Sequence, residues 1–397
     1  MNEDELETMR RSFGTVKQRS DVIKKSPNTK RLISKVQEIK KYSIKYYEML
    51  LNQLEDSFSD NGIEYRFAET SQDALNIIDE LLDENNIKVI AKSKSNTLGE
   101  IGLKNHLDDK GVEVVETDLG DRILQLKKSD NKPVHPTGPA SHLNVSSIAG
   151  IVNEALDCDV GDDPYDIMRV VRSDVLKRIK NANAGISGAN VIAAEEGSCV
   201  MVHNEGNISL VSLKDLHIIV AGIDKIVPTL EDAISVVKLE TIFATGKHVT
   251  SYMNIISGPS KTADIEKKLL KNMYGAKKVV VILLDNGRSK TTNKCLQCIG
   301  CGNCIINCPV YNTIGNEFGF NNYLGGRGIA MSKYIEDDET CYNSGLYMCT
   351  LCGLCTLNCP LSIPTNEIIE KIRTEIEFSP QTHKKIKNNI SNNNSPY

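Results

Sequence analysis

Ten of the twelve cysteines in this 397-residue chain lie between Cys295 and Cys359, and their spacing is the strongest constraint on the fold. Eight of them form two copies of one pattern, C-x-x-C-x-x-C-x-x-x-C-P. Two-residue gaps let three thiolates reach successive corners of one iron–sulfur cube, and the proline directs the fourth cysteine to the other cluster. The first run holds Cys298, Cys301, Cys304 and Cys308, and the second holds Cys349, Cys352, Cys355 and Cys359.

This spacing predicts two [4Fe-4S] clusters with crossed ligation. Gly302 and Gly353 follow the second cysteine of each run, where close backbone approach to a sulfide favours glycine. A pair of four-cysteine zinc sites is the alternative, but zinc sites usually show C-x-x-C pairs rather than triplets ending in C-P. The 41 positions from Cys308 to Cys349 leave room for helices, so we expect a mainly helical ferredoxin domain. The first cluster would take Cys298, Cys301, Cys304 and Cys359, and the second Cys349, Cys352, Cys355 and Cys308.

Four cysteines fall outside this pattern. Cys295 and Cys341 are expected to be plain thiols because eight ligand positions are already filled, and a spare or labile ligand is the alternative. Cys158 and Cys199 are expected to be buried small apolar residues. Clustered thiols and an acidic N-terminus without an apolar signal region favour a cytoplasmic protein without disulfides.

Charge and hydropathy argue against several classes of protein. A net charge of −5 gives no support for nucleic-acid binding. No apolar run approaches the ~20 residues of a membrane span. Residues 1–50 hold 12 basic and 7 acidic residues. A solvated helical face is the simplest interpretation of this basic segment, and a docking arm is the alternative.

Upstream of the cysteines, short apolar runs alternate with helical patterns, which is typical of an α/β domain with a largely parallel sheet. Within it we expect an antiparallel hairpin with strands 199–203 and 208–212, and a helix over 262–272. The chain is expected to divide into a helical basic segment (1–60), the α/β domain (61–285), a polar linker (286–294), a two-cluster cysteine domain (295–375) and a polar, disordered tail (376–397).

Polar strings that follow expected strands supply candidate ligand-binding residues. Lys92, Ser93 and Lys94 follow an expected strand and can hold an anion, with a polar turn as the alternative. The two histidines are candidate bases, and the two glutamates, beside the expected turn, are candidate carboxylates; structural or surface roles are the alternatives. No nucleotide fingerprint follows a strand, so no flavin site is predicted and no catalytic residue is assigned. The candidates are Lys92, Ser93, Lys94, His135, His142, Glu195, Glu205, Gly206 and Asn207.

Read together, these strings resemble a known family. The strings KSKSNTLGEIGL, HPTGPASH and VVVILLDNGRS, followed by the two cysteine runs, are similar to the B-type iron–sulfur subunit of the lactate-utilisation complex. The resemblance covers roughly residues 30–375 in the same order. In that family a lactate-utilisation (LUD) domain precedes paired ferredoxin motifs. The resemblance therefore implies a NagB/RpiA/CoA-transferase-like α/β domain followed by a two-cluster domain.

The resemblance also implies a function. It implies an iron–sulfur electron-transfer subunit of a complex that oxidises L-lactate, or a related 2-hydroxy acid, to the 2-oxo acid. Its partners would be a cysteine-rich redox subunit and a second LUD-domain subunit, with a small organic acid as ligand. The alternative is an electron adaptor for another anaerobic oxidoreductase, with the LUD domain as a docking or ligand-binding module.

Overall fold

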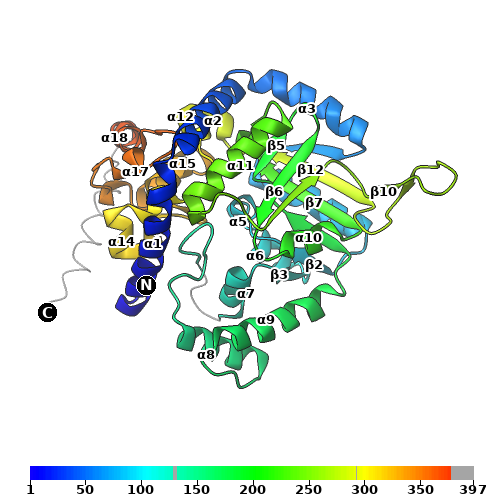
Figure 1. The fold of residues 1–397 in the computed structure, drawn as a ribbon, viewed down its shortest axis with the longest axis horizontal. Helices are drawn as coiled ribbons and strands as arrows, with labels where there is room; N and C mark the ends of the chain where they lie inside the picture. The colour runs from blue at the N-terminus through cyan, green and yellow to red at the C-terminus, as the bar shows by residue number, and fades with distance from the viewer. Residues whose placement is uncertain (128–131, 292, 377–397) are drawn as a thin grey trace.

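Three consecutive helices open the computed structural model, which describes residues 1–127, 132–291 and 293–376. Their starts carry local capping signals. Asn2 forms a capping box at the first helix, and Ser26 caps the second, which has proline at its first position. The first helix packs against both α11 (Leu230–Thr245) and α14 (Pro309–Ile314), so the basic segment joins the two later domains (Figure 1). The three are α1 (Glu3–Lys24), α2 (Pro27–Lys45) and α3 (Tyr47–Asn61).

A six-stranded sheet, all parallel, forms the centre of the α/β domain and confirms the predicted fold class. Its order is β1-β12-β7-β4-β2-β3. The two longest strands, β7 and β12, are buried almost throughout, as expected where helices cover both faces of a parallel sheet. The strands are β1 (Glu64–Ala68), β2 (Val89–Lys92), β3 (Glu113–Glu116), β4 (Ala184–Ser187), β7 (Leu216–Gly222) and β12 (Lys278–Leu284).

Each face of this sheet has its own hydrophobic core. On one face the apolar sides of α4 (Ser71–Glu84), α5 (Asn96–Glu100) and α6 (Leu103–Asp109) pack against the strands. On the other face α3 covers β1, β7 and β12, while α8 (Val145–Leu156) and α9 (Pro164–Ile179) cover β2 and β3 (Figure 1). The helix α7 (Leu119–Leu126) lies beside α8 and α9.

A second, four-stranded sheet stands beside the first and corrects the predicted hairpin. Its order is β8-β5-β6-β9, and α11 packs on it. Residues 208–212 belong to the helix α10 (Asn207–Ser212), because Ile208 and Val211 face the core at helical spacing and Gly206 takes the left-handed conformation before it. The strands are β5 (Val191–Ala193), β6 (Ser198–His203), β8 (Ile226–Val227) and β9 (Tyr252–Ile256).

The prediction of a helix over 262–272 was also wrong. This segment is a hairpin of β10 (Lys261–Thr262) and β11 (Leu270–Lys271) that projects from the body (Figure 1). Its apolar residues Ile265 and Leu269 are exposed, so they have no core against which a helical stripe could pack.

The cysteine domain is mainly helical, as predicted, with one short hairpin of β13 (Gly319–Phe320) and β14 (Tyr323–Leu324). From residue 377 onward, the expected tail lies outside the described residues. Among the helices that the structure describes, none has the length and apolar character needed to cross a bilayer. The remaining helices of this domain are α12 (Asn293–Leu296), α13 (Asn303–Ile306), α15 (Gly325–Ile335), α16 (Asp338–Asn343), α17 (Leu354–Leu357) and α18 (Thr365–Glu375).

Candidate functional site

The two cysteine runs fold into the same local shape. Gly302 and Gly353 have φ values of 71° and 73°, and each precedes a four-residue helix, α13 or α17. Two residues earlier, Gly300 and Leu351 also have positive φ. The helices α13 and α17 contact each other, so the two runs lie face to face.

The fourth cysteine of each run lies with the first three of the other run. Burial raises the pKa of Cys301 well above its ordinary value, and the nearby sulfurs of Cys359, Cys304 and Cys298 raise it further. Burial also raises the pKa of Cys308; backbone N–H groups oppose this shift, and the sulfurs of Cys355 and Cys349 add to it. Cys359 thus lies near the first three cysteines of the first run, and Cys308 lies near Cys355 and Cys349 of the second. We refer to the predicted ligand groups as the first cysteine set (Cys298, Cys301, Cys304 and Cys359) and the second cysteine set (Cys349, Cys352, Cys355 and Cys308).

The cysteine environment fits an iron–sulfur cluster. A cavity of about 60 Å³ is lined by three cysteines of the first run together with Cys355 and Cys359. The N–H of Gly300 donates to the Cys298 sulfur over 3.4 Å, and burial raises the pKa of Cys359 while backbone hydrogen bonds from residues 361–363 oppose this shift. Clustered, buried thiolates repel one another unless a cationic group binds them.

The two cysteine sets differ in exposure. Cys301 of the first set is only 8% exposed, whereas Cys352 of the second set is an exposed residue. Apolar side chains near the second set also reach solvent, most of all Leu357, which is 79% exposed, and Met348. The first set is therefore the more buried of the two, although the other three cysteines of each set are half-buried.

The other four cysteines have separate surroundings. Cys341 is buried and its thiol donates to the Ile329 carbonyl over 3.3 Å, and burial raises its pKa to about 11. Cys295 is buried as well. Cys199 is buried, as expected, and burial raises its pKa to about 12, whereas Cys158 is half-buried rather than buried.

The larger cavity, about 630 Å³, lies where the carboxyl ends of β2, β3 and β4 meet α1 and the first cysteine run. Its wall includes Lys94 and Asp118 after the strand ends, and Ile299 and Gly300 between two cysteines of the first set. Open parallel sheets bind ligands at this edge. The cavity therefore lies directly beside the buried cysteine set.

Four of the nine predicted ligand-binding residues line this cavity: Lys94, His135, Glu205 and Asn207. Lys94 pairs with Asp118 over 2.8 Å, and Glu205 accepts the N–H of Leu119 over 3.0 Å. Burial raises the pKa of Glu205 and would lower that of Lys94, but nearby Asp118 raises the Lys94 pKa above its ordinary value. These groups form a charged corner at the strand ends.

The other five predicted residues lie outside the cavity lining. Lys92 is buried in an ion pair with Glu116 at 2.8 Å, and the Ser93 hydroxyl is buried with no partner among the described residues. His142 is buried elsewhere. Gly206 precedes α10.

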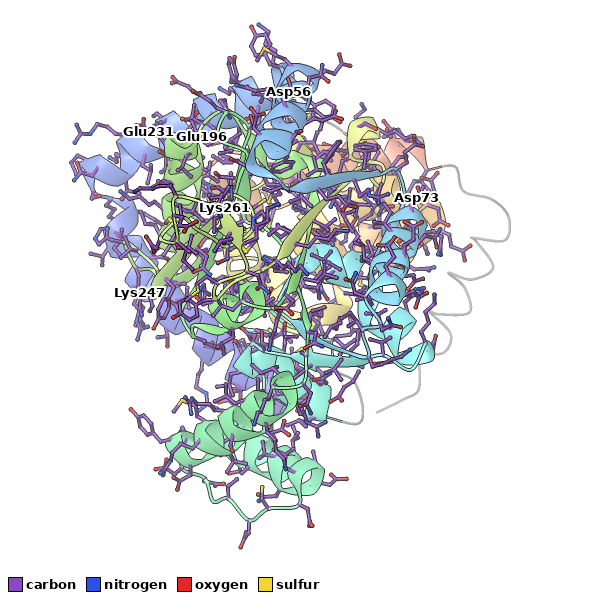
Figure 2. All side chains as sticks on the ribbon, turned by 90° about the vertical axis from the view of Figure 1, so that its right-hand side faces the viewer. Asp56, Asp73, Glu196, Glu231, Lys247 and Lys261 are labelled. Carbon is purple, nitrogen blue, oxygen red and sulfur yellow. The ribbon has the colours of Figure 1, made fainter. Side chains whose placement is uncertain are left out.

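Glu195, the fifth, is exposed on the loop between β5 and β6. Figure 2 shows its neighbour Glu196 close to Glu231 and well apart from Lys247, which lines the cavity. The side chain of Glu196 accepts the N–H of Leu230 over 2.8 Å at the start of α11. This loop therefore caps a helix rather than facing the cavity.

His135 separates the cavity from the first cysteine set. Its ring packs on Phe13 with 5.4 Å between centroids, and its Nδ1 lies 2.9 Å from the Thr137 hydroxyl. A Cβ at Gly302 would lie 2.6 Å from its Nε2. Burial lowers the pKa of His135 to about 4, so the ring is neutral at pH 7.

Sequence reasoning missed Asn190, Lys225 and Glu240, which also line the cavity. The Asn190 amide donates to both Glu240 carboxylate oxygens at 3.0 and 3.1 Å. Burial raises the pKa of Glu240 to about 7, and its carboxylate lies 3.9 Å from where a Cβ on Gly300 would stand. The sequence signal for Glu240 was weak, because it is only the one acidic residue in the second half of α11.

Comparisons with known proteins fit this geometry. Residues 51–284 match the LUD domain family, and residues 294–363 match the 4Fe-4S dicluster domain family. The chain is 34% identical over 345 residues to lactate utilization protein B of Bacillus cytotoxicus, which covers 86% of this chain and 70% of that protein. Lactate utilization protein B of Macrococcus caseolyticus matches to the same extent. A crystal structure of a DUF162 family protein from Deinococcus radiodurans aligns with 60% of this chain and 98% of its own, at 16% identity and a TM-score of 0.33.

Proposed function

This chain belongs to the LUD-domain proteins and to the lactate utilization protein B family, and from that premise we propose that it is an electron-transfer subunit of a complex that oxidises L-lactate, or a related 2-hydroxy acid, to the 2-oxo acid. The observation that carries the proposal is that the large cavity and the buried cysteine set share the wall formed by Ile299 and Gly300. A ligand in this cavity would lie beside an electron acceptor.

Two [4Fe-4S] clusters are the proposed cofactors, and they would supply one-electron transfer when bound. The crossed proximity of the cysteines supports this assignment. Burial raises the pKa of Cys304, and the sulfurs of Cys298, Cys359 and Cys355 raise it further. Because Cys355 belongs to the second set, the two sets lie next to each other. The proposed ligand sets are Cys298, Cys301, Cys304 and Cys359 for the first cluster, and Cys349, Cys352, Cys355 and Cys308 for the second.

The electron count agrees with this assignment. Oxidation of a 2-hydroxy acid to a 2-oxo acid releases two electrons and two protons. Two cluster sites in one chain match that number at one electron each. We propose that the electrons leave from the exposed second set, near Leu357, to a cysteine-rich redox subunit. A second LUD-domain subunit completes the proposed complex.

The large cavity is the proposed site for the small organic acid. Four cationic side chains line its wall against three carboxylates, and two of the cations, Lys94 and Lys225, are already paired with Asp118 and Asp224. Arg19 and Lys247 form no ion pair among the described residues, so they are the proposed cations for a carboxylate. Glu240 lies at the Gly300 end and, with its pKa raised by burial to about 7, can accept a proton near neutral pH. The neutral ring of His135 closes the wall toward the cysteines.

Two measurements test this function. The anaerobically purified chain should be brown, absorb broadly near 400 nm and hold about eight irons. Stoichiometric zinc without that absorbance would overturn the cluster assignment. Deletion of the gene should abolish growth on lactate and lactate-dependent dye reduction, and the intact gene should restore both. Normal lactate oxidation in the deletion strain would reject the proposed substrate.

A further inference from the structure

The side chain of Arg327, near the start of α15, lines the small cavity of the first cysteine set. Its guanidinium stacks on the Tyr323 ring, 5.4 Å from the ring centroid. Burial would lower the pKa of Arg327, but the Cys298 sulfur, followed by Tyr323 and Asp224, raises it. A permanent positive charge therefore stands beside a sulfur of this set.

Among the described residues, Arg327 makes no hydrogen bond and no ion pair, and its Nε is shielded from solvent without a partner. Removing a guanidinium from water is costly unless a negative group compensates it. The carboxylate of Asp224 raises the pKa of Arg327, but it forms its ion pairs with Arg288 and Lys225 and none with Arg327. An anionic group in the cavity, where four thiolates would meet a cluster, would supply the missing partner.

A second buried cation lies on the same side of this set. Lys40 is 3% exposed, and its ammonium donates to the backbone carbonyl of Asp224 over 2.5 Å. Burial lowers its pKa to about 8, while Asp224 and, more weakly, the Cys298 sulfur act in the opposite direction. Arg327 and Lys40 thus both place positive charge toward Cys298.

The second cysteine set has a different surrounding. The guanidinium of Arg373 beside this set already has hydrogen-bond partners, because it donates to the carbonyls of Leu346 and Cys349 at 2.7 and 2.6 Å. Cys352 is exposed, so solvent screens charge there. The two sets therefore differ in their electrostatic surroundings.

We propose that Arg327 sets the reduction potential of the first cluster above that of the second, so that an electron rests in the buried cluster beside the large cavity. Reduction adds negative charge to a cluster, and a fixed cation in a poorly solvated site stabilises the reduced form. This inference rests on the proposed function only in that both clusters are bound. The network around Tyr323 holds the arginine in place, because Tyr323 itself donates to Glu100 over 2.6 Å.

The test is an EPR-monitored redox titration of the full chain with both clusters bound. At a fixed potential, Arg327→Gln should lower the reduced-to-oxidised ratio of the first cluster at least tenfold, which is a shift of about 59 mV for one electron. The second cluster should keep its potential. Arg327→Lys keeps the positive charge and should shift the ratio less. Lys333→Gln is the matched control, because it removes one charge from the same helix at a residue that pairs with Asp338 and Glu375 instead.

Lys40→Met provides an independent measure, with a smaller shift expected in the same direction. If Arg327→Gln does not retain the first cluster, a lowered ratio in Lys40→Met supports the proposal, and an unchanged ratio overturns it. Unchanged potentials in an Arg327→Gln protein that holds both clusters also overturn it. A colourless, iron-free parent protein would instead reject the proposed function.

Discussion

Arg288 and Glu100 form a two-point ion pair, at 2.9 and 2.7 Å, in the junction between the α/β domain and the cysteine domain. Arg288 belongs to the segment expected to be a polar linker, yet it is 2% exposed. Its Nε also donates to Asp224 over 2.8 Å, and its Nη2 to the Tyr323 hydroxyl over 3.1 Å. The linker therefore fastens the two domains to each other.

Breaking this pair should destabilise the whole chain. Arg288→Met would leave Glu100 as an uncompensated buried charge, which costs about 3–5 kcal/mol, whereas Asp224 would keep its ion pair with Lys225. We expect a lower melting temperature under anaerobic conditions. Arg66→Gln, which removes a half-exposed pair with Glu64, should cost less than about 1 kcal/mol. Equal losses in the two variants would contradict the proposed role of the junction.

Crossed ligation makes a specific prediction for Cys308. Although Cys308 belongs to the first run, Cys308→Ala should disturb the cluster held mainly by Cys349, Cys352 and Cys355, because the sulfurs of Cys355 and Cys349 lie near its own. EPR of the dithionite-reduced protein would show which signal is lost. Loss of only the first-run signal would refute the crossed arrangement.

Gly302 and Gly353 form a matched pair for mutation. An alanine at either position must adopt a left-handed conformation, at a cost of roughly 1–2 kcal/mol. Only at Gly302 would the new Cβ also collide with His135, whereas at Gly353 the nearest atom is 3.9 Å away. Gly302→Ala should therefore lower the melting temperature and the iron content more than Gly353→Ala. Identical effects would show that the His135 contact adds nothing.

His217 predicts a pH dependence of stability. It is buried in β7 with its Nε2 2.9 Å from the Ser187 hydroxyl, and burial lowers its pKa from 6.5 to about 4. Between about pH 6.5 and pH 4, His217 is protonated in the unfolded chain but neutral in the folded chain. Lowering the pH through this range therefore lowers the free energy of unfolding. Between pH 7.5 and 5.5 this loss is about 1.4 kcal/mol.

The measurement is the difference between the parent protein and His217→Gln in thermal unfolding at those two pH values. The stability advantage of the parent should shrink on acidification, because the variant lacks this titrating group. His248→Gln, at an exposed position, is the control and should leave the pH dependence unchanged. A parent advantage that stays constant with pH would contradict the assignment.

The features that were predictable from sequence are those set by short-range spacing. The cysteine runs repeat one local geometry, and residues 294–363 match the 4Fe-4S dicluster domain family that their spacing predicted, while the crossed pairing of Cys308 and Cys359 stays a prediction. The alternation of apolar runs with helical patterns likewise predicted the parallel sheet. Short apolar segments such as 208–212 do not distinguish a strand from a buried helix, and there the prediction failed.

The large cavity was harder to predict, because its walls come from distant parts of the chain. Phe13 of α1, Glu240 of α11 and Gly300 of the first cysteine run meet there, and no local pattern relates them. The burial of Arg288 was not predicted, for a similar reason. A charged residue in a polar segment normally lies in solvent, and only its partners Glu100 and Asp224, far away in sequence, make its burial favourable.

The position of α1 also has a consequence for how the chain is made. Arg10 donates to the Asn312 carbonyl over 2.7 Å, and Lys24 to the Asn303 side chain over 3.0 Å. The helix α1 therefore cannot reach its final place until almost three hundred more residues have been synthesised. Until then the apolar face of this helix, which includes Met9 and Phe13, lacks part of the surface against which it packs. Docking of this helix is thus among the last events in the folding of the chain.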